Sequence, residues 1–226
     1  MLSNLFHYDN PVWRFIGKFF DVMVLNLLWV ICSIPIVTVG ASTTAVYYVT
    51  MKLVRDENDS VVKAFFRSFK ENFKQATVIW LILLLSGALI GFDIYFFLYI
   101  QTAQSAVRTV MMALLFAFAI LWVLISLYAF PLQAKFYNPI RRTLFNGFFM
   151  SVRHILQSLV MLVTDAAIVV IALLVPMLFM LLVLFGFPLL AFFNSYIFVW
   201  IFDKYIPKKE SAQEEGDFWE LPEENS

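Results

Sequence analysis

The residues of this sequence that could carry chemistry are the few polar side chains inside its long apolar stretches. Asp165 is the one residue with a charged side chain at neutral pH between Ile155 and Phe202, and Asn194 lies in the same stretch. An ionisable group among apolar helices is costly unless it meets a partner or water. We therefore interpret Asp165 and Asn194 as a candidate site for a cation or for the hydroxyls of a solute. The alternatives are a structural hydrogen bond that locks the last two helices, or a protonated carboxyl with no function.

A second polar cluster, Ser42, Thr43 and Thr44, follows the small residues Gly40 and Ala41. Small hydroxylated residues allow helices to approach each other closely. Free N–H groups at the start of a helix could instead bind an anion or a carbonyl oxygen. Both interpretations stay open, so these three residues join the pair above in one candidate intramembrane polar site.

Motifs of known catalytic sites are absent from the sequence. There is no HExxH, no glycine-rich phosphate loop and no GxGD, and the two histidines, His7 and His154, lie far apart. The single cysteine, Cys32, excludes a disulfide within one chain. We therefore expect no enzyme activity, no catalytic residues, no metal site and no cofactor.

The stretches around these residues are too long and too uniformly apolar for a soluble core. Apolar residues make up 62% of the sequence and charged residues 14%, against about 25% charged in soluble domains. The stretch from Thr109 to Gln133 has no charged residue. A helix that is apolar on every face over such a length suits the interior of a bilayer. The prediction is an all-α, polytopic transmembrane helical bundle whose main partner is the lipid bilayer.

The expected membrane helices follow the apolar stretches and the helix breakers between them. A first helix is predicted over residues 12–34, then a turn at 35–40 and a short helix to about residue 55. Four further spans are predicted: Ala76–Ile100, Thr109–Phe130, Ile155–Met177 and Leu182–Asp203. Lysine and arginine are concentrated in residues 52–74 and 131–154, which places these loops and the C-terminus in the cytoplasm. The preferred count is about six membrane helices with both ends inside, and the alternative is five with the N-terminus outside.

Two basic segments have the pattern of helices that lie flat at a membrane surface. Residues 60–75 repeat four basic side chains at helical spacing beside a face rich in phenylalanine: Lys63, Arg67, Lys70 and Lys74. A second, weaker amphipathic segment follows Arg141 and Arg142. Cations among the headgroups and phenylalanine at the acyl boundary would stabilise such interfacial helices. Packing against the protein's own spans is the other interpretation, and the two do not exclude each other.

The chain divides into one helical membrane domain, residues 1–206, and an acidic tail, residues 207–226. The tail carries two lysines against seven acidic residues, so we expect a flexible cytosolic extension. The net charge of the whole chain is zero and its basic residues flank the spans. No nucleic-acid partner is expected.

Three segments are distinctive in their order: residues 9–15 (DNPVWRF), 33–44 (SIPIVTVGASTT) and 65–77 (FFRSFKENFKQAT). Together they resemble the YesL-like family, bacterial integral membrane proteins of unknown function, and the resemblance covers about residues 5–205. It implies a multi-pass protein of the bacterial plasma membrane, often encoded near genes for carbohydrate uptake and polysaccharide degradation. No catalytic residues are established in that family, so none is carried over to this chain.

The resemblance favours an accessory component of carbohydrate uptake, with subunits of a carbohydrate ABC transporter as its partners. The alternative is a small-solute transporter, alone or as a homo-oligomer, that uses a polar site around Asp165. The accessory function predicts no solute flux by the protein alone. The transporter function predicts flux that depends on Asp165.

Overall fold

The computed structural model describes residues 11–57, 60–100 and 106–205, and the regular structure within these ranges is entirely helical. The order is α1 (Pro11–Ser33), the 3-10 turn η2 (Ile36–Thr38), α2 (Val39–Val54), α3 (Val61–Tyr95), the π-helical turn η3 (Phe96–Ile100), α4 (Ala106–Lys135), α5 (Ile140–Arg153), α6 (Ile155–Leu174) and α7 (Pro176–Phe202). The predicted all-α fold is confirmed, including the first helix, the turn after it and the short second helix. The predicted acidic tail, residues 207–226, lies outside the described residues.

Four of the described helices are long and apolar enough to cross a membrane, which indicates a membrane protein. They are α3 with its extension to Tyr99, α4, α6 and α7. Helices α1 and α2, which the count of about six needs as an additional hairpin, are not among these four. The count of six is therefore not confirmed.

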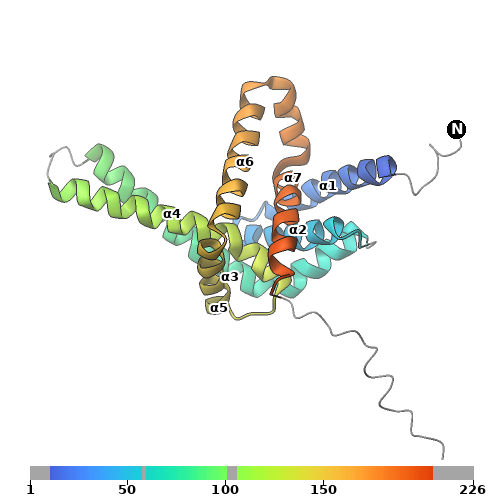
Figure 1. The fold of residues 1–226 in the computed structure, drawn as a ribbon, viewed down its shortest axis with the longest axis horizontal. Coiled ribbons are helices and arrows are strands. Elements are labelled where there is room, and N and C mark those ends of the chain that lie inside the picture. Colours follow the sequence, from blue (N-terminus) through green and yellow to red (C-terminus); the bar gives the residue numbers. More distant parts are fainter. Residues whose placement is uncertain (1–10, 58–59, 101–105, 206–226) are drawn as a thin grey trace, which may run out of the picture.

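Helix α2 is the centre of the structure. Twelve of its sixteen residues are buried, and it contacts α1, α3, α4 and α7. Its first half consists of small side chains, so the neighbouring helices can pack close to its backbone. Figure 1 shows the α3–α4 hairpin and the α6–α7 hairpin leaving this centre in different directions. The expected bundle is therefore packed around α2 but open at the hairpin ends.

The basic segment at residues 60–75 is not a separate helix, contrary to expectation. It forms the first turns of α3, a single helix of 35 residues. No glycine or proline interrupts the junction near Ala76, so nothing in the local sequence ends the helix there. At 1.5 Å per residue α3 is about 52 Å long, well above the ~30 Å of a hydrocarbon core.

The buried faces of the two basic helices are also not the phenylalanine faces. On α3 the buried stripe repeats every four residues in small or polar side chains: Ala64, Ser68, Asn72 and Ala76. On α5 the buried residues are Thr143, Gly147 and Ser151. Phenylalanines of both segments are exposed instead, Phe66 and Phe73 on α3 and Phe145 and Phe149 on α5, whereas Phe65 is fully buried.

Three predicted span boundaries are wrong, and each lies next to a proline. Helix α6 ends at Leu174, before the predicted Met177, because Val175 precedes Pro176 and takes an extended conformation (φ −114°, ψ 106°). Helix α7 then begins at Pro176, well before the predicted Leu182. Helix α4 continues through Pro131 to Lys135, beyond the predicted end at Phe130. Residues 128–133 are buried, and neighbouring helices stabilise a proline inside such a helix.

Helices α2 and α3 approach each other closely at Gly40, and this contact generates a prediction. A Cβ atom at this position would collide with the backbone oxygen of Ala76 and the Cβ atom of Trp80. Gly40→Ala should therefore lower the free energy of unfolding in detergent by about 1–3 kcal/mol. The matched control is Gly91→Ala on α3, where a Cβ meets nothing within 4 Å. That variant should be neutral or slightly more stable, and equal unfolding midpoints for the two variants would contradict this packing.

Candidate functional site

The central polar contact joins α6 to α7 inside their apolar stretches. Asn194 Nδ2 donates a hydrogen bond of 2.7 Å to Asp165 Oδ2. Asn194 is buried and Asp165 is partly buried, about halfway along α6. The second carboxyl oxygen, Asp165 Oδ1, is buried and has no hydrogen-bond partner among the described residues. The hydrogen bond expected from the sequence is present, and one oxygen remains available to a proton, a cation or a donor group.

Helix α2 packs against this contact as the third helix. The buried Tyr47 lies near Asn194, close enough for their side chains to interact. One turn further along α2, the hydroxyls of Thr50 and Ser195 lie 2.7 Å apart. The rings of Phe187 and Phe198 pack edge-on against Tyr47, each with centroids 5.7 Å away. Asn194 is therefore held between a phenol and a carboxyl group in an aromatic surrounding.

A break in α7 lies two turns before Asn194. Gly186 has a non-helical backbone (φ 49°, ψ −146°), and Pro188 follows it without an N–H group. The carbonyl groups of the preceding turn accept hydrogen bonds from Asn26 Nδ2 of α1, at 3.1 Å for Val183 and 2.9 Å for Leu184. In lipid each backbone polar group needs a partner inside the protein. Asn26 supplies that partner, so α1 stabilises the broken conformation of α7.

The hydroxyl cluster of α2 does not join the Asp165 contact. Ser42 and Thr44 donate hydrogen bonds to the carbonyl groups of Thr38 and Gly40, four residues earlier. Thr43 accepts a hydrogen bond of 3.3 Å from Trp29 Nε1 of α1. All three residues are buried. Their hydroxyls are thus engaged in local bonds and in packing with α1, which favours the packing interpretation.

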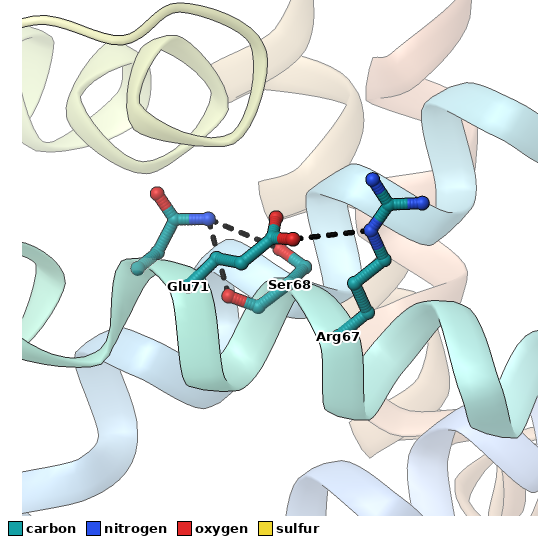
Figure 2. A network of polar contacts seen from close by, with 4 residues as sticks. Arg67, Ser68 and Glu71 are labelled. Carbon is teal, nitrogen blue, oxygen red and sulfur yellow. Dashed lines mark hydrogen bonds and ion pairs between the residues drawn. The ribbon is translucent and has the colours of Figure 1, made fainter.

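The predicted membrane-interface residues lie apart from Asp165, on the exposed faces of α3 and α5. All six are exposed: Lys63, Arg67, Lys70, Lys74, Arg141 and Arg142. Arg67 Nε donates a hydrogen bond of 3.1 Å to Glu71, and Figure 2 shows these two side chains directed toward each other along α3. Cationic side chains therefore follow the outer surface of both helices, as a headgroup contact would require.

A buried polar network holds these two basic helices to α4. Gln133 Nε2 of α4 donates to Asn72 (3.1 Å) and to Gln75 (2.8 Å) of α3. Thr143 of α5 donates to Gln133 Oε1 at 3.2 Å. Asn72 in turn donates to the carbonyl and hydroxyl oxygens of Ser68. One glutamine thus fixes the position of α3 relative to α5.

Sequence reasoning missed Tyr47, Thr50 and Gln133. Tyr47 and Thr50 lie three residues apart, which places them on one face of a helix, and this spacing was a usable signal. Gln133 stands at the end of an uncharged stretch and gave no comparable signal. Within the described residues no group of three or more His, Cys, Asp or Glu side chains could hold a metal ion.

Comparison with known proteins finds a similarity over part of the chain. Residues 22–94 match a family described as "Protein of unknown function, DUF624". The matched segment contains most of α1, all of α2 and nearly all of α3, so it includes Asn26 and Tyr47 but not Asp165 or Asn194. Neither the search of curated proteins nor the search of solved structures found a match. The similarity is thus to an uncharacterised family and assigns no activity to these residues.

The contact between Asn26 and the break in α7 generates a second prediction. Asn26→Ala leaves the carbonyl groups of Val183 and Leu184 without these hydrogen bonds and should cost about 1–2 kcal/mol in unfolding free energy. Hydrogen–deuterium exchange around Gly186 should rise at the same time. Asn138→Ala, in the link between α4 and α5, is the control and should leave exchange in α7 unchanged. Unaltered exchange in Asn26→Ala would show that α1 does not stabilise the break.

Proposed function

We propose that this protein is a non-catalytic partner subunit of a carbohydrate importer in the bacterial plasma membrane, with its C-terminus in the cytoplasm. The observation that carries this proposal is an apolar groove of about 420 Å³ on the α3–α4 hairpin. Small residues of both helices line it, including Ala88, Gly91 and Ala119. Small residues permit the close backbone approach by which helices associate in lipid. A transmembrane helix of another protein fits such a groove.

The low burial of the two hairpins supports contact with a partner protein. Only 6% of the most apolar stretch of α3 and of α4 is buried, and 17% in α6 and α7. A Cβ atom at Gly91 would meet no other atom within 4 Å, so the groove is open at this position. These surfaces are available both to lipid and to a second membrane protein.

The charge distribution supports the proposed orientation. Lys52 and Arg55 at the end of α2 and Lys135 at the end of α4 line one small cavity. Arg55 also forms an ion pair with Asp203 at the end of α7. Three helices therefore end at one level, where Lys52, Arg55 and Lys135 lie beside Glu57 and Asp203. The positive-inside rule counts lysine and arginine and not net charge, so this level suits the cytoplasmic side. The link to carbohydrate uptake is supported by the resemblance of three segments to YesL-like proteins.

Photo-crosslinking tests the partner function. A photoreactive amino acid at Ala88, inside the groove, should give an adduct with a subunit of a carbohydrate transporter in intact cells. Gly91→Leu should fill the groove and reduce that adduct at least tenfold, because a partner helix could no longer approach. The control places the same photoreactive group at Leu173, near the tip of the α6–α7 hairpin. Gly91→Leu should leave the adducts from this position unchanged. Adducts with lipid alone, or with a second copy of this chain alone, would contradict the proposal.

A second candidate function is solute transport through the site around Asp165. The specific support is the buried Asp165 Oδ1, which has no hydrogen-bond partner among the described residues. Asn194 orients the Asp165 carboxyl group by its hydrogen bond, and Tyr47 lies beside this contact. A carboxyl oxygen oriented in this way inside a span can bind a coupling proton or a hydroxyl group of a sugar. The broken α7 nearby resembles the discontinuous helices that form such sites in transporters.

Flux through purified protein separates the two functions. If the protein is a transporter, proteoliposomes should take up labelled mono- or disaccharides, and Asp165→Asn should lower the uptake rate at least tenfold. Asp93→Asn, an exposed carboxylate near the far end of α3, is the matched control and should keep the rate. No uptake above that of empty vesicles would exclude transport of these sugars by the protein alone and leave the partner function in place.

A further inference from the structure

A groove of about 680 Å³ lies between α3 and the link from α4 to α5. It is lined by residues 69–75 of α3 and by Tyr137 of the link. This groove is separate from the contact around Asp165 and from the small-residue groove of the α3–α4 hairpin. Its lining combines lysines, phenylalanines and amide side chains, which suits a ligand with one charged and one apolar part.

The position of the groove along α3 places it at the level of lipid headgroups. From Gln75 to Phe92 the helix has no charged residue, and these 18 residues measure about 27 Å. That length is close to the ~30 Å of the hydrocarbon core. Lys70 and Lys74 precede this stretch directly, so they lie where phosphate groups of the lipids are found.

The groove carries a net positive charge. Lys70 and Lys74 are exposed, lie one turn apart, and make no ion pair with the described residues. The one acidic residue of the lining, Glu71, is paired with Arg67 at 3.1 Å, and Figure 2 shows it turned along the helix toward that guanidinium. The charge of the carboxylate is thereby offset. Two ammonium groups remain for an anion.

The remaining lining is fixed and partly apolar. Asn72 and Gln75 accept hydrogen bonds from Gln133, so the polar floor is already occupied by contacts within the protein. The rings of Phe69 and Phe73 contact each other with centroids 5.5 Å apart, and Phe73 is exposed. Tyr137 stands on the opposite side and is 86% exposed. Phe73 is the ring nearer the uncharged stretch of α3, so the start of an apolar chain can contact it while a charged group meets the lysines.

We propose that this groove binds one anionic phospholipid, with its phosphate held by Lys70 and Lys74 and the first carbons of its acyl chains against Phe73, the ring nearest the uncharged stretch that begins at Gln75. Charge complementarity selects an anionic lipid over a zwitterionic one, because the groove supplies two cations and its own acid is neutralised by Arg67. The phenylalanine wall selects a lipid over a free phosphate, which would gain nothing from it. Figure 2 contains the ion pair on which this selectivity depends.

Native mass spectrometry of the purified full-length protein in a neutral detergent tests this site. The protein is titrated separately with phosphatidylglycerol, with phosphatidylcholine and with inorganic phosphate. We expect a saturable adduct of one phosphatidylglycerol, with little binding of the other two at the same concentrations. Lys70→Gln with Lys74→Gln should weaken the phosphatidylglycerol adduct about thirtyfold, since each cation near a lipid surface contributes about a factor of five.

The control removes the same charge elsewhere on the two basic helices, by Lys63→Gln with Arg142→Gln. It should change the affinity for phosphatidylglycerol no more than about threefold. Both double variants alter exposed side chains, and equal unfolding midpoints would show that both remain folded. An equal loss of affinity in the two double variants would overturn the site in favour of diffuse electrostatic attraction. Equally strong binding of phosphatidylcholine, or displacement of the lipid by inorganic phosphate, would overturn it as well.

Discussion

Close backbone approach is the interaction on which the fold depends. In lipid, helices gain little by hiding apolar side chains from each other, so contact between backbones and interhelical hydrogen bonds must hold them together. Gly40 of α2 meets the backbone of Ala76 and the Cβ atom of Trp80. The small residues that follow it are buried along the same helix. A larger side chain at Gly40 would separate α2 from α3. Because α3 carries part of the buried network around Gln133, α2 would also move away from the network that positions α5.

The second constraint is the satisfaction of polar groups far from water. The break at Gly186 frees carbonyl oxygens of α7, and the amide of Asn26 occupies two of them. After the break, Asn194 donates a hydrogen bond to Asp165 on one side and lies near Tyr47 on the other. Three helices therefore meet α7 through its polar side chains or its freed carbonyl groups, although α7 is otherwise among the most apolar segments. The same contacts can serve stability or transport, and the unpartnered carboxyl oxygen of Asp165 is the feature that transport would use.

Local chemistry in the sequence predicted which segments are helical and several of their ends, but not the start of α3 or which faces pack. The uniform apolar stretches and Pro35 placed most helices within a few residues. The phenylalanine period of α3 predicted its apolar face correctly, yet the packed face is the one with Ser68 and Asn72. That choice depends on Gln133, which lies far away in the chain. The Asp165–Asn194 hydrogen bond could be predicted because both residues interrupt apolar helices, whereas Tyr47 and Asn26 acquire their roles only through the fold.

Four phenylalanines of α3 and α5 point outward, which agrees with the predicted position of these helices at a membrane surface. In a protein surrounded by water, a helix with this pattern would bury its aromatic face and expose its small residues. Here Thr143 and Gly147 of α5 are buried while Phe145 and Phe149 face outward beside exposed arginines. Exposing large apolar rings next to cations is favourable at the boundary between acyl chains and headgroups, because the rings contact acyl chains and the cations contact headgroups. The beginning of α3, the end of α4 and α5 therefore share one level, and the network around Gln133 holds them there in a fixed arrangement.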